Sequence, residues 1–202
     1  MIRRAVWAVV VVAAAVSCRA PAPPVDLSGA WPAQAGDFEE VDAAWTRRAV
    51  LRGGFEQTLE VYATFQAPPW LAARAAEDAT QRGGPRDALL AAAQARAEGD
   101  YQFGLVVATH ERAENDLDRG ARATWHVALV DATGAEIPPS SISRDRRPAS
   151  VLRAELPGYG DFSTAYQVAF PRTAAALGPD VRQVTLRVWS GHGSVALTWR
   201  AR

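Results

Sequence analysis

The chain has 202 residues, of which 22 are basic and 22 acidic, so its formal net charge at pH 7 is zero. This balance excludes the strong positive field with which nucleic-acid-binding proteins attract phosphate, and it excludes charge-driven binding to anionic lipid. Every basic residue is arginine. We interpret this as the codon bias of a GC-rich bacterial genome, so a single arginine carries little functional information.

The first 17 residues have the pattern of a secretory signal peptide. Arg3 and Arg4 precede an uncharged run over residues 5–16. A positively charged start followed by a short apolar run is typical of such signals. The run is shorter than the roughly 20 residues that a membrane-spanning helix needs. We therefore predict that residues 1–17 are removed on export.

The run closes with Ala15-Val16-Ser17-Cys18, which resembles the lipobox of bacterial lipoproteins. In that family, small residues precede a cysteine that receives diacylglycerol and becomes the mature N-terminus, so the resemblance implies that Cys18 is lipidated. Cys18 is the only cysteine and cannot form an internal disulfide. The alternative is an ordinary signal peptide cut near Ala15 or Ser17. Arg19 is not the aspartate associated with inner-membrane retention in this family, which favours the outer membrane.

Residues 18–36 predict a lipidated N-terminus followed by a tether. The segment holds four prolines among Ala, Gly and Ser, with little periodic apolar content. Such a segment buries too little surface to order itself. At about 3.1 Å per residue it would lift the following domain roughly 50 Å from the bilayer. We expect Trp31 to dock on that domain, because its apolar area would otherwise face water.

Residues 37–202 predict one β domain that opens with a hairpin. A first strand is expected over residues 44–52, and Gly53-Gly54 suits a tight turn. The partner strand, residues 55–66, alternates cleanly, with Leu59, Val61, Ala63 and Phe65 facing one way. This period of two is typical of a half-buried strand.

A helical hairpin is expected as an insert at about residues 69–98. Residues 70–81 and 86–98 are rich in alanine, and Gly83-Gly84 separates the two segments. Leu89, Ala93 and Ala97 form one helical stripe on the second segment. We interpret the insert as a lid over the open end or edge of the sheets. The alternative is an interface, for which Trp70 would be an exposed anchor.

Short alternating strands separated by turns follow the insert. They are expected from residue 101, over 122–130, near 136–137, around Tyr166 to Phe170, and as a final hairpin that contains His192 near its tip. Residues 140–160 read as irregular. Seven or eight such strands predict a mainly β fold, an antiparallel β-sandwich of immunoglobulin-like or transthyretin-like type with the helical hairpin inserted.

Familiar catalytic and metal-binding motifs are incomplete. His110 and Glu111 begin like a zinc-protease motif, but Glu114 stands where the second histidine belongs. Glu114, Asp116 and Asp118 alternate like the ligands of a calcium loop, without its glycine or its closing glutamate. The three histidines, His110, His126 and His192, show no metal-ligand spacing. We predict no metal and no cofactor.

The remaining candidates are binding residues. Arg144, Arg146 and Arg147 form a basic knot suited to an acidic partner or a phosphate, although Asp145 partly neutralises it. Together with Trp70 these are the predicted surface-binding residues. Trp125, Trp189 and Trp199 fall on strands, where core or sheet-face aromatics belong.

These observations favour a non-enzymatic, membrane-anchored envelope lipoprotein that acts as a structural or interaction module. Its expected partners are the membrane, through the lipid anchor, and an envelope protein, with no nucleic acid. One alternative is an envelope hydrolase with a site assembled from loops, in which His110, Asp116 or His192 would take part. A second is a carrier of a small ligand or glycan on the sheet face beneath the helical insert.

Overall fold

The computed structural model describes residues 22–202 except residues 55, 132, 173 and 174. Its helices are α1 (Phe38–Trp45), α2 (Pro68–Arg82), α3 (Arg86–Ala97) and α4 (Ala149–Glu155), with 3-10 turns η1 (Arg112–Glu114) and η2 (Leu117–Arg122). Its strands are β1 (Thr46–Gly53), β2 (Glu56–Phe65), β3 (Tyr101–Thr109), β4 (His126–Val130), β5 (Glu136–Ile137), β6 (Ser141–Arg144), β7 (Ser163–Phe170), β8 (Gln183–Ser190) and β9 (Gly193–Arg200). The predicted signal peptide and Cys18 lie outside the described residues.

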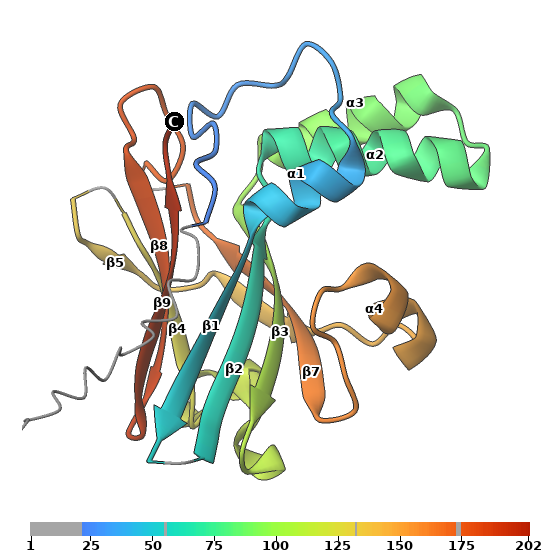
Figure 1. Ribbon diagram of the computed structural model, residues 1–202. Helices are drawn as coiled ribbons and strands as arrows, with labels where there is room; N and C mark the ends of the chain where they lie inside the picture. Colours follow the sequence, from blue (N-terminus) through green and yellow to red (C-terminus); the bar gives the residue numbers. More distant parts are fainter. Residues whose placement is uncertain (1–21, 55, 132, 173–174) are drawn as a thin grey trace, which may run out of the picture.

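The strands form two antiparallel sheets, and Figure 1 shows them facing each other. The first sheet has the order β1-β2-β3-β7-β6, and the second has the order β5-β4-β8-β9. One hydrophobic core lies between them, with Phe65, Phe103 and Phe170 from the first sheet and Leu186 and Trp199 from the second. The prediction of a mainly β fold is confirmed, and the arrangement is consistent with a β-sandwich.

The hairpin of β1 and β2 follows its predicted pattern. Leu59, Val61, Ala63 and Phe65 are at most 1% exposed, so the alternation correctly marked the core face of β2. Gly54 adopts a φ of +63°, which favours glycine at the turn.

A helix that the sequence analysis missed precedes this hairpin. The strand expected from residue 44 begins only at Thr46, because α1 occupies residues 38–45. The side chain of Asp37 caps α1 by accepting a hydrogen bond from the backbone N–H of Glu40, and Glu39 and Glu40 lie in its first turn. The buried Trp45 is therefore the last residue of a helix and not part of a strand.

The two helices of the expected insert are α2 and α3. Pro68 begins α2, and Gly83 ends it with a left-handed φ of +63°. α2 buries Leu71 and three alanines, whereas no residue of α3 is fully buried. Figure 1 shows α1, α2 and α3 gathered at one end of the first sheet. Among the helices that the structure describes, none has the length and apolarity needed to cross a bilayer.

The tether predicted up to residue 36 is wrong from about residue 23 onward. Val25 and Leu27 are 2% and 1% exposed and belong to the hydrophobic core. Val25 forms a parallel bridge with Ala201, next to the end of β9. Two apolar side chains within three positions of Pro24 were enough to hold this part of the chain on the domain.

Two later boundaries also differ. The region 140–160, expected to be irregular, contains β6 and α4. The strand expected over 122–130 begins at His126, because η2 precedes it. Leu152 of α4 is 2% exposed, so burial of this side chain, and not helical propensity, holds this short helix in place.

Candidate ligand-binding cleft

The outer face of the first sheet carries a row of small and polar residues. The strand register places Thr46, Thr64, Gly104 and Gln167 side by side across β1, β2, β3 and β7. The hydroxyls of Thr46 and Thr64 lie 2.7 Å apart in a hydrogen bond. The absence of a Cβ at Gly104 leaves room, since one placed there would lie 3.2 Å from Nε2 of Gln66. The row forms a polar floor.

Two covers stand over this floor and leave a cleft between them. On one side are α1 and α2, and on the other are α4 and the turn that follows it, residues 156–159. Gly158 of that turn presses on Tyr62, because a Cβ on Gly158 would lie 2.2 Å from the tyrosine ring. The two covers meet where Arg74 of α2 binds Glu155 of α4 at 3.0 Å.

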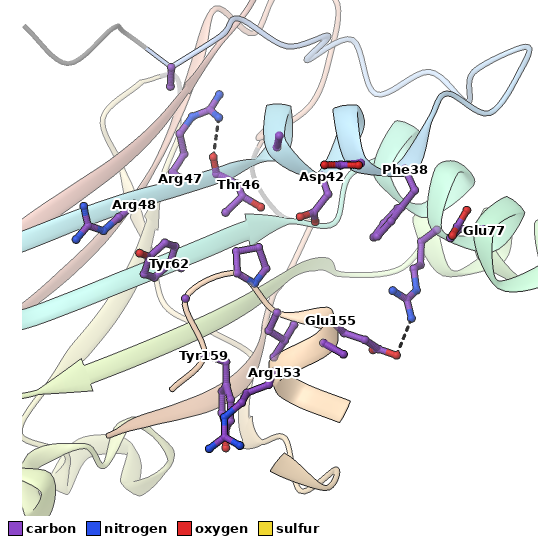
Figure 2. Close-up of a pocket in the computed structure, with 18 of the residues that line it drawn as sticks. Phe38, Asp42, Thr46, Arg47, Arg48, Tyr62, Glu77, Arg153, Glu155 and Tyr159 are labelled. Atoms are coloured by element: carbon purple, nitrogen blue, oxygen red, sulfur yellow. Dashed lines mark hydrogen bonds and ion pairs between the residues drawn. The ribbon is translucent and has the colours of Figure 1, made fainter. Parts of the chain in front are cut away.

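The larger cavity of the cleft has a volume of about 1090 Å³. Figure 2 shows Phe38, Asp42, Tyr62 and Tyr159 lining it, with α1 above and the α4 turn below. Asp42 is held there by the indole N–H of Trp70, which donates to its Oδ1 at 2.7 Å. Burial raises the pKa of Asp42 above its usual value, although the Trp70 bond opposes this shift.

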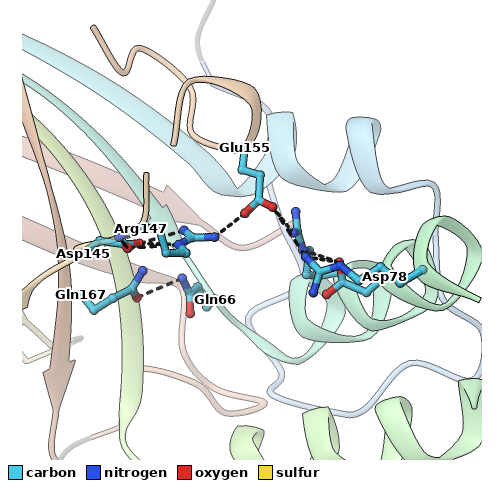
Figure 3. A network of polar contacts seen from close by, with 8 residues as sticks. Gln66, Asp78, Asp145, Arg147, Glu155 and Gln167 are labelled. Atoms are coloured by element: carbon cyan, nitrogen blue, oxygen red, sulfur yellow. Dashed lines mark hydrogen bonds and ion pairs between the residues drawn. The ribbon is translucent and has the colours of Figure 1, made fainter. Parts of the chain in front are cut away.

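The smaller cavity lies beneath the helical insert and has a volume of about 500 Å³. A network of polar contacts surrounds it, shown in Figure 3. Arg147 donates to Asp145 at 2.7 Å and also binds Glu155, which in turn binds Arg74. Arg74 completes this side of the network by binding Asp78 at 3.2 Å.

The carboxylates of the network are held in their charged form. The hydrogen bond from Arg147 lowers the pKa of Asp145, and Gln167 adds a smaller contribution. Partial burial acts to raise the pKa of Glu155, but hydrogen bonds and charge from Arg147 and Arg74 outweigh it, so this pKa is also lowered. The ion pairs therefore persist at neutral pH.

All four predicted binding residues line this smaller cavity: Trp70, Arg144, Arg146 and Arg147. Trp70 is not the exposed anchor that was predicted, because it is partly buried against the core and its ring contacts Phe38 edge-on at 5.8 Å. Arg144 turns toward Asp118 at 3.0 Å. Arg146 is exposed and, among the described residues, forms no ion pair.

Gln66, Gln167, Arg96 and Glu155 also line the cavity and were missed by sequence reasoning. The outward parity of Gln167 on β7 is a usable signal, since a polar residue on a strand marks its solvent-facing side. No local pattern could have identified Glu155, whose partner Arg74 lies 81 positions earlier in the chain.

The residues considered for catalysis or metal binding lie apart. His192 contacts Glu114 at 3.2 Å, His110 contacts Glu56 at 3.6 Å, and His126 lies against the ring of Trp189. Among the described residues, no three His, Cys, Asp or Glu side chains gather into a metal-binding group.

The acidic loop that resembled a calcium site uses its carboxylates for structure. Asp116 is 3% exposed and accepts a hydrogen bond from the backbone N–H of Thr124 at 2.8 Å, which fixes the loop. Asp118 and Glu114 turn away to Arg144 and His192. The three carboxylates therefore have three separate partners and do not converge on one point.

Comparisons with protein-family models, with curated proteins and with solved structures found no match for this chain.

Proposed function

We propose that this protein is an exported, lipid-anchored module of the cell envelope that binds a small polar ligand in its cleft. The observation that carries the proposal is the open cleft over the outer face of the first sheet, whose floor is polar and whose walls are two helical covers. Ligand pockets of several hundred Å³ with a few convergent polar groups are typical of binding sites. The cleft lies beneath the helical insert, where a carrier would hold its ligand.

A role in binding, and not in catalysis, is supported by the chemistry of the cleft. Its charged groups are mostly arginines paired with carboxylates, and the three histidines lie elsewhere. Such pairs hold a polar surface in place, whereas general acid–base work needs a titratable group near neutral pH within reach of the ligand.

The anchor of this module is Cys18, proposed from the lipobox-like sequence. Only four residues separate Cys18 from Pro23, whose carbonyl accepts a hydrogen bond from Arg47 at 2.9 Å. Five Cα steps of at most about 3.6 Å span at most about 18 Å. A lipidated Cys18 would therefore hold the domain close to the bilayer surface, and not at the roughly 50 Å expected from a tether that reached residue 36. We propose the outer membrane as the location, from Arg19 after the cysteine.

For the fold, we propose an immunoglobulin-like or transthyretin-like sandwich. The two facing antiparallel sheets with one core between them support this type.

The anchor is tested by fractionation and mass measurement of the full chain in a bacterial host. Wild-type protein is expected in the membrane fraction with the mass of the attached acyl chains. Cys18→Ser removes the acyl acceptor, so this variant should lack that mass. Ser17→Ala keeps a small residue before the cysteine and should behave as wild type. Wild-type protein that is soluble and carries no acyl mass would refute the anchor.

The cleft is tested by what it retains during purification. Ala154 of α4 is exposed and lines the larger cavity, so Ala154→Trp should fill the cleft without disturbing the core. Ala149 is exposed on the same helix outside the cavity, and Ala149→Trp is the matched control. Mass spectrometry of small molecules released on denaturation should find a solute with wild type and Ala149→Trp that Ala154→Trp lacks. Equal retention by both variants would refute the proposal.

A further inference from the structure

The contacts around the smaller cavity form one chain of alternating charge. Arg82 and Arg74 both contact Asp78, and both contact Glu155. Glu155 also binds Arg147, which binds Asp145. In this series of contacts, Asp78 and Glu155 each lie between arginines, and Asp145 lies between Arg147 and the amide of Gln167. The negative charge of each carboxylate is therefore balanced by its neighbours.

The other end of this series of contacts is Arg96, whose guanidinium has no carboxylate partner among the described residues. Arg96 of α3 donates to Oε1 of Gln66, whose Nε2 donates to Oε1 of Gln167 at 3.3 Å. Among the described residues Arg96 forms no ion pair, unlike Arg74 and Arg147, which line the same cavity. A guanidinium has five N–H groups, and a neutral amide uses only one of those of Arg96.

The surroundings of Arg96 leave it short of negative charge. Six arginines and four carboxylates line the cavity. One of the four, Asp42, is occupied by Trp70, and another, Asp145, by Arg147. Desolvation lowers the pKa of Arg96, and no nearby carboxylate opposes this shift. The side chain nevertheless belongs to an exposed residue, so a solute can reach it.

We propose that the smaller cavity binds a small anion, through a carboxylate or phosphate group held by Arg96 beside the Gln66–Gln167 amide pair. An anion bound to Arg96 by two hydrogen bonds would supply the negative charge that this end of the series of contacts lacks. The polar floor at Thr64 and Gly104 provides space and hydrogen-bonding groups for the rest of the molecule. This inference rests on the proposed binding role of the cleft and names its ligand class.

The test is isothermal titration calorimetry on the full lipidated chain in a non-ionic detergent. The probes are inorganic phosphate, glucuronate as a sugar carboxylate, and glucose as its neutral counterpart. Arg96→Gln removes the charge, and Arg96→Lys keeps the charge but loses the planar fork. Arg86→Gln is the matched control, since Arg86 begins the same helix, is exposed and does not line the cavity. Urea unfolding confirms that each variant is folded.

We expect phosphate or glucuronate to bind wild type and Arg86→Gln with equal affinity, and glucose not to bind. Loss of a charge-assisted hydrogen bond should weaken binding to Arg96→Gln by about tenfold or more, with Arg96→Lys between the two. Binding of phosphate alone would identify a phosphorylated ligand, and binding of glucuronate alone an acidic sugar.

Three results would overturn the anion site. Failure of both phosphate and glucuronate to bind would do so, and so would equal affinity for wild type and Arg96→Gln. Binding of glucose as strongly as glucuronate would show that charge does not matter here. None of these results affects retention of a solute by Ala149→Trp and its loss from Ala154→Trp, so the broader proposal can stand while this one fails.

Discussion

Arg47 connects the N-terminal segment and β9 to the junction of α1 and β1, and its replacement should weaken this connection. The residue is buried, with only 6% of its surface exposed. Its guanidinium donates to four backbone carbonyls, those of Pro23, Ala44, Thr46 and Thr198, at 2.7–3.0 Å. These carbonyls belong to the N-terminal segment, the end of α1, the start of β1 and β9.

The expected loss of stability depends on two opposing contributions, the cost of burying the Arg47 charge and the hydrogen bonds that this charge makes. Burial, with a smaller contribution from the charge of Arg200, lowers the pKa of Arg47 to about 10, so the group stays charged at neutral pH but its desolvation is costly. Each hydrogen bond to a charged group contributes about 1.5–3 kcal/mol. Arg47→Met removes the desolvation cost but leaves four carbonyls without this donor. We therefore expect a net loss of about 3 kcal/mol in the free energy of unfolding, or roughly 6–12 °C in Tm.

The assay is urea unfolding followed by tryptophan fluorescence, paired with limited proteolysis. Because the Pro23 carbonyl loses its partner, the segment that carries Val25 and Leu27 should be cleaved sooner in Arg47→Met than in wild type. Arg182→Met is the control, since Arg182 is exposed and should change stability by less than about 0.5 kcal/mol. A loss below about 1 kcal/mol with unchanged proteolysis would refute the role of Arg47.

Three further predictions concern the cleft. The pKa of Glu155 is lowered on folding, so its contribution to stability is present above its ordinary pKa of 4.5 and disappears as pH falls through the lowered pKa. Urea unfolding should therefore find Glu155→Gln less stable than wild type at pH 7, and the difference should be smaller at pH 3. The pKa of Asp42 is raised, so its ionisation opposes folding above its ordinary value of 3.8. Asp42→Asn should raise the unfolding midpoint at pH 7 but not at pH 3. Gly158→Ala should cost about 1–3 kcal/mol, because φ is +75° and the new Cβ would overlap Tyr62; an unchanged Tm would contradict the close contact.

The strands of the core could be predicted because their signal is local. In β2 the side chains alternate between core and solvent, and a period of two is visible within ten residues. The same holds for Val184, Leu186 and Val188 of β8, all buried completely. α1 was missed because Trp45, at the end of the helix, has the same parity as the inward residues of a strand. Trp45 is buried, as an inward residue of the expected strand would be, but it is the last residue of a helix.

The candidate site could be predicted only in part. The basic knot and Trp70 were selected as binding residues, and they do line one cavity. Their partners were not identified, because a polar residue gives no local sign of which distant group it will meet. Trp70 illustrates the limit: an aromatic residue after two prolines looks exposed until α1, which comes earlier in the chain, packs on it through Phe38.

The sequence by itself determined the alternation that builds the strands of the two antiparallel sheets, because this pattern depends on neighbouring residues. The proposal that Cys18 is lipidated likewise rests on a local pattern. Tertiary structure decided where the N-terminal segment joins the domain, where on the first sheet the cleft lies, and which charged side chains have no partner of opposite charge among the described residues. The physical reason is the range of the interactions. Burial periodicity acts over a few residues, whereas the cleft exists because Arg74, Glu155 and Gln167, far apart in the chain, are brought together by packing of the helical covers on the sheet.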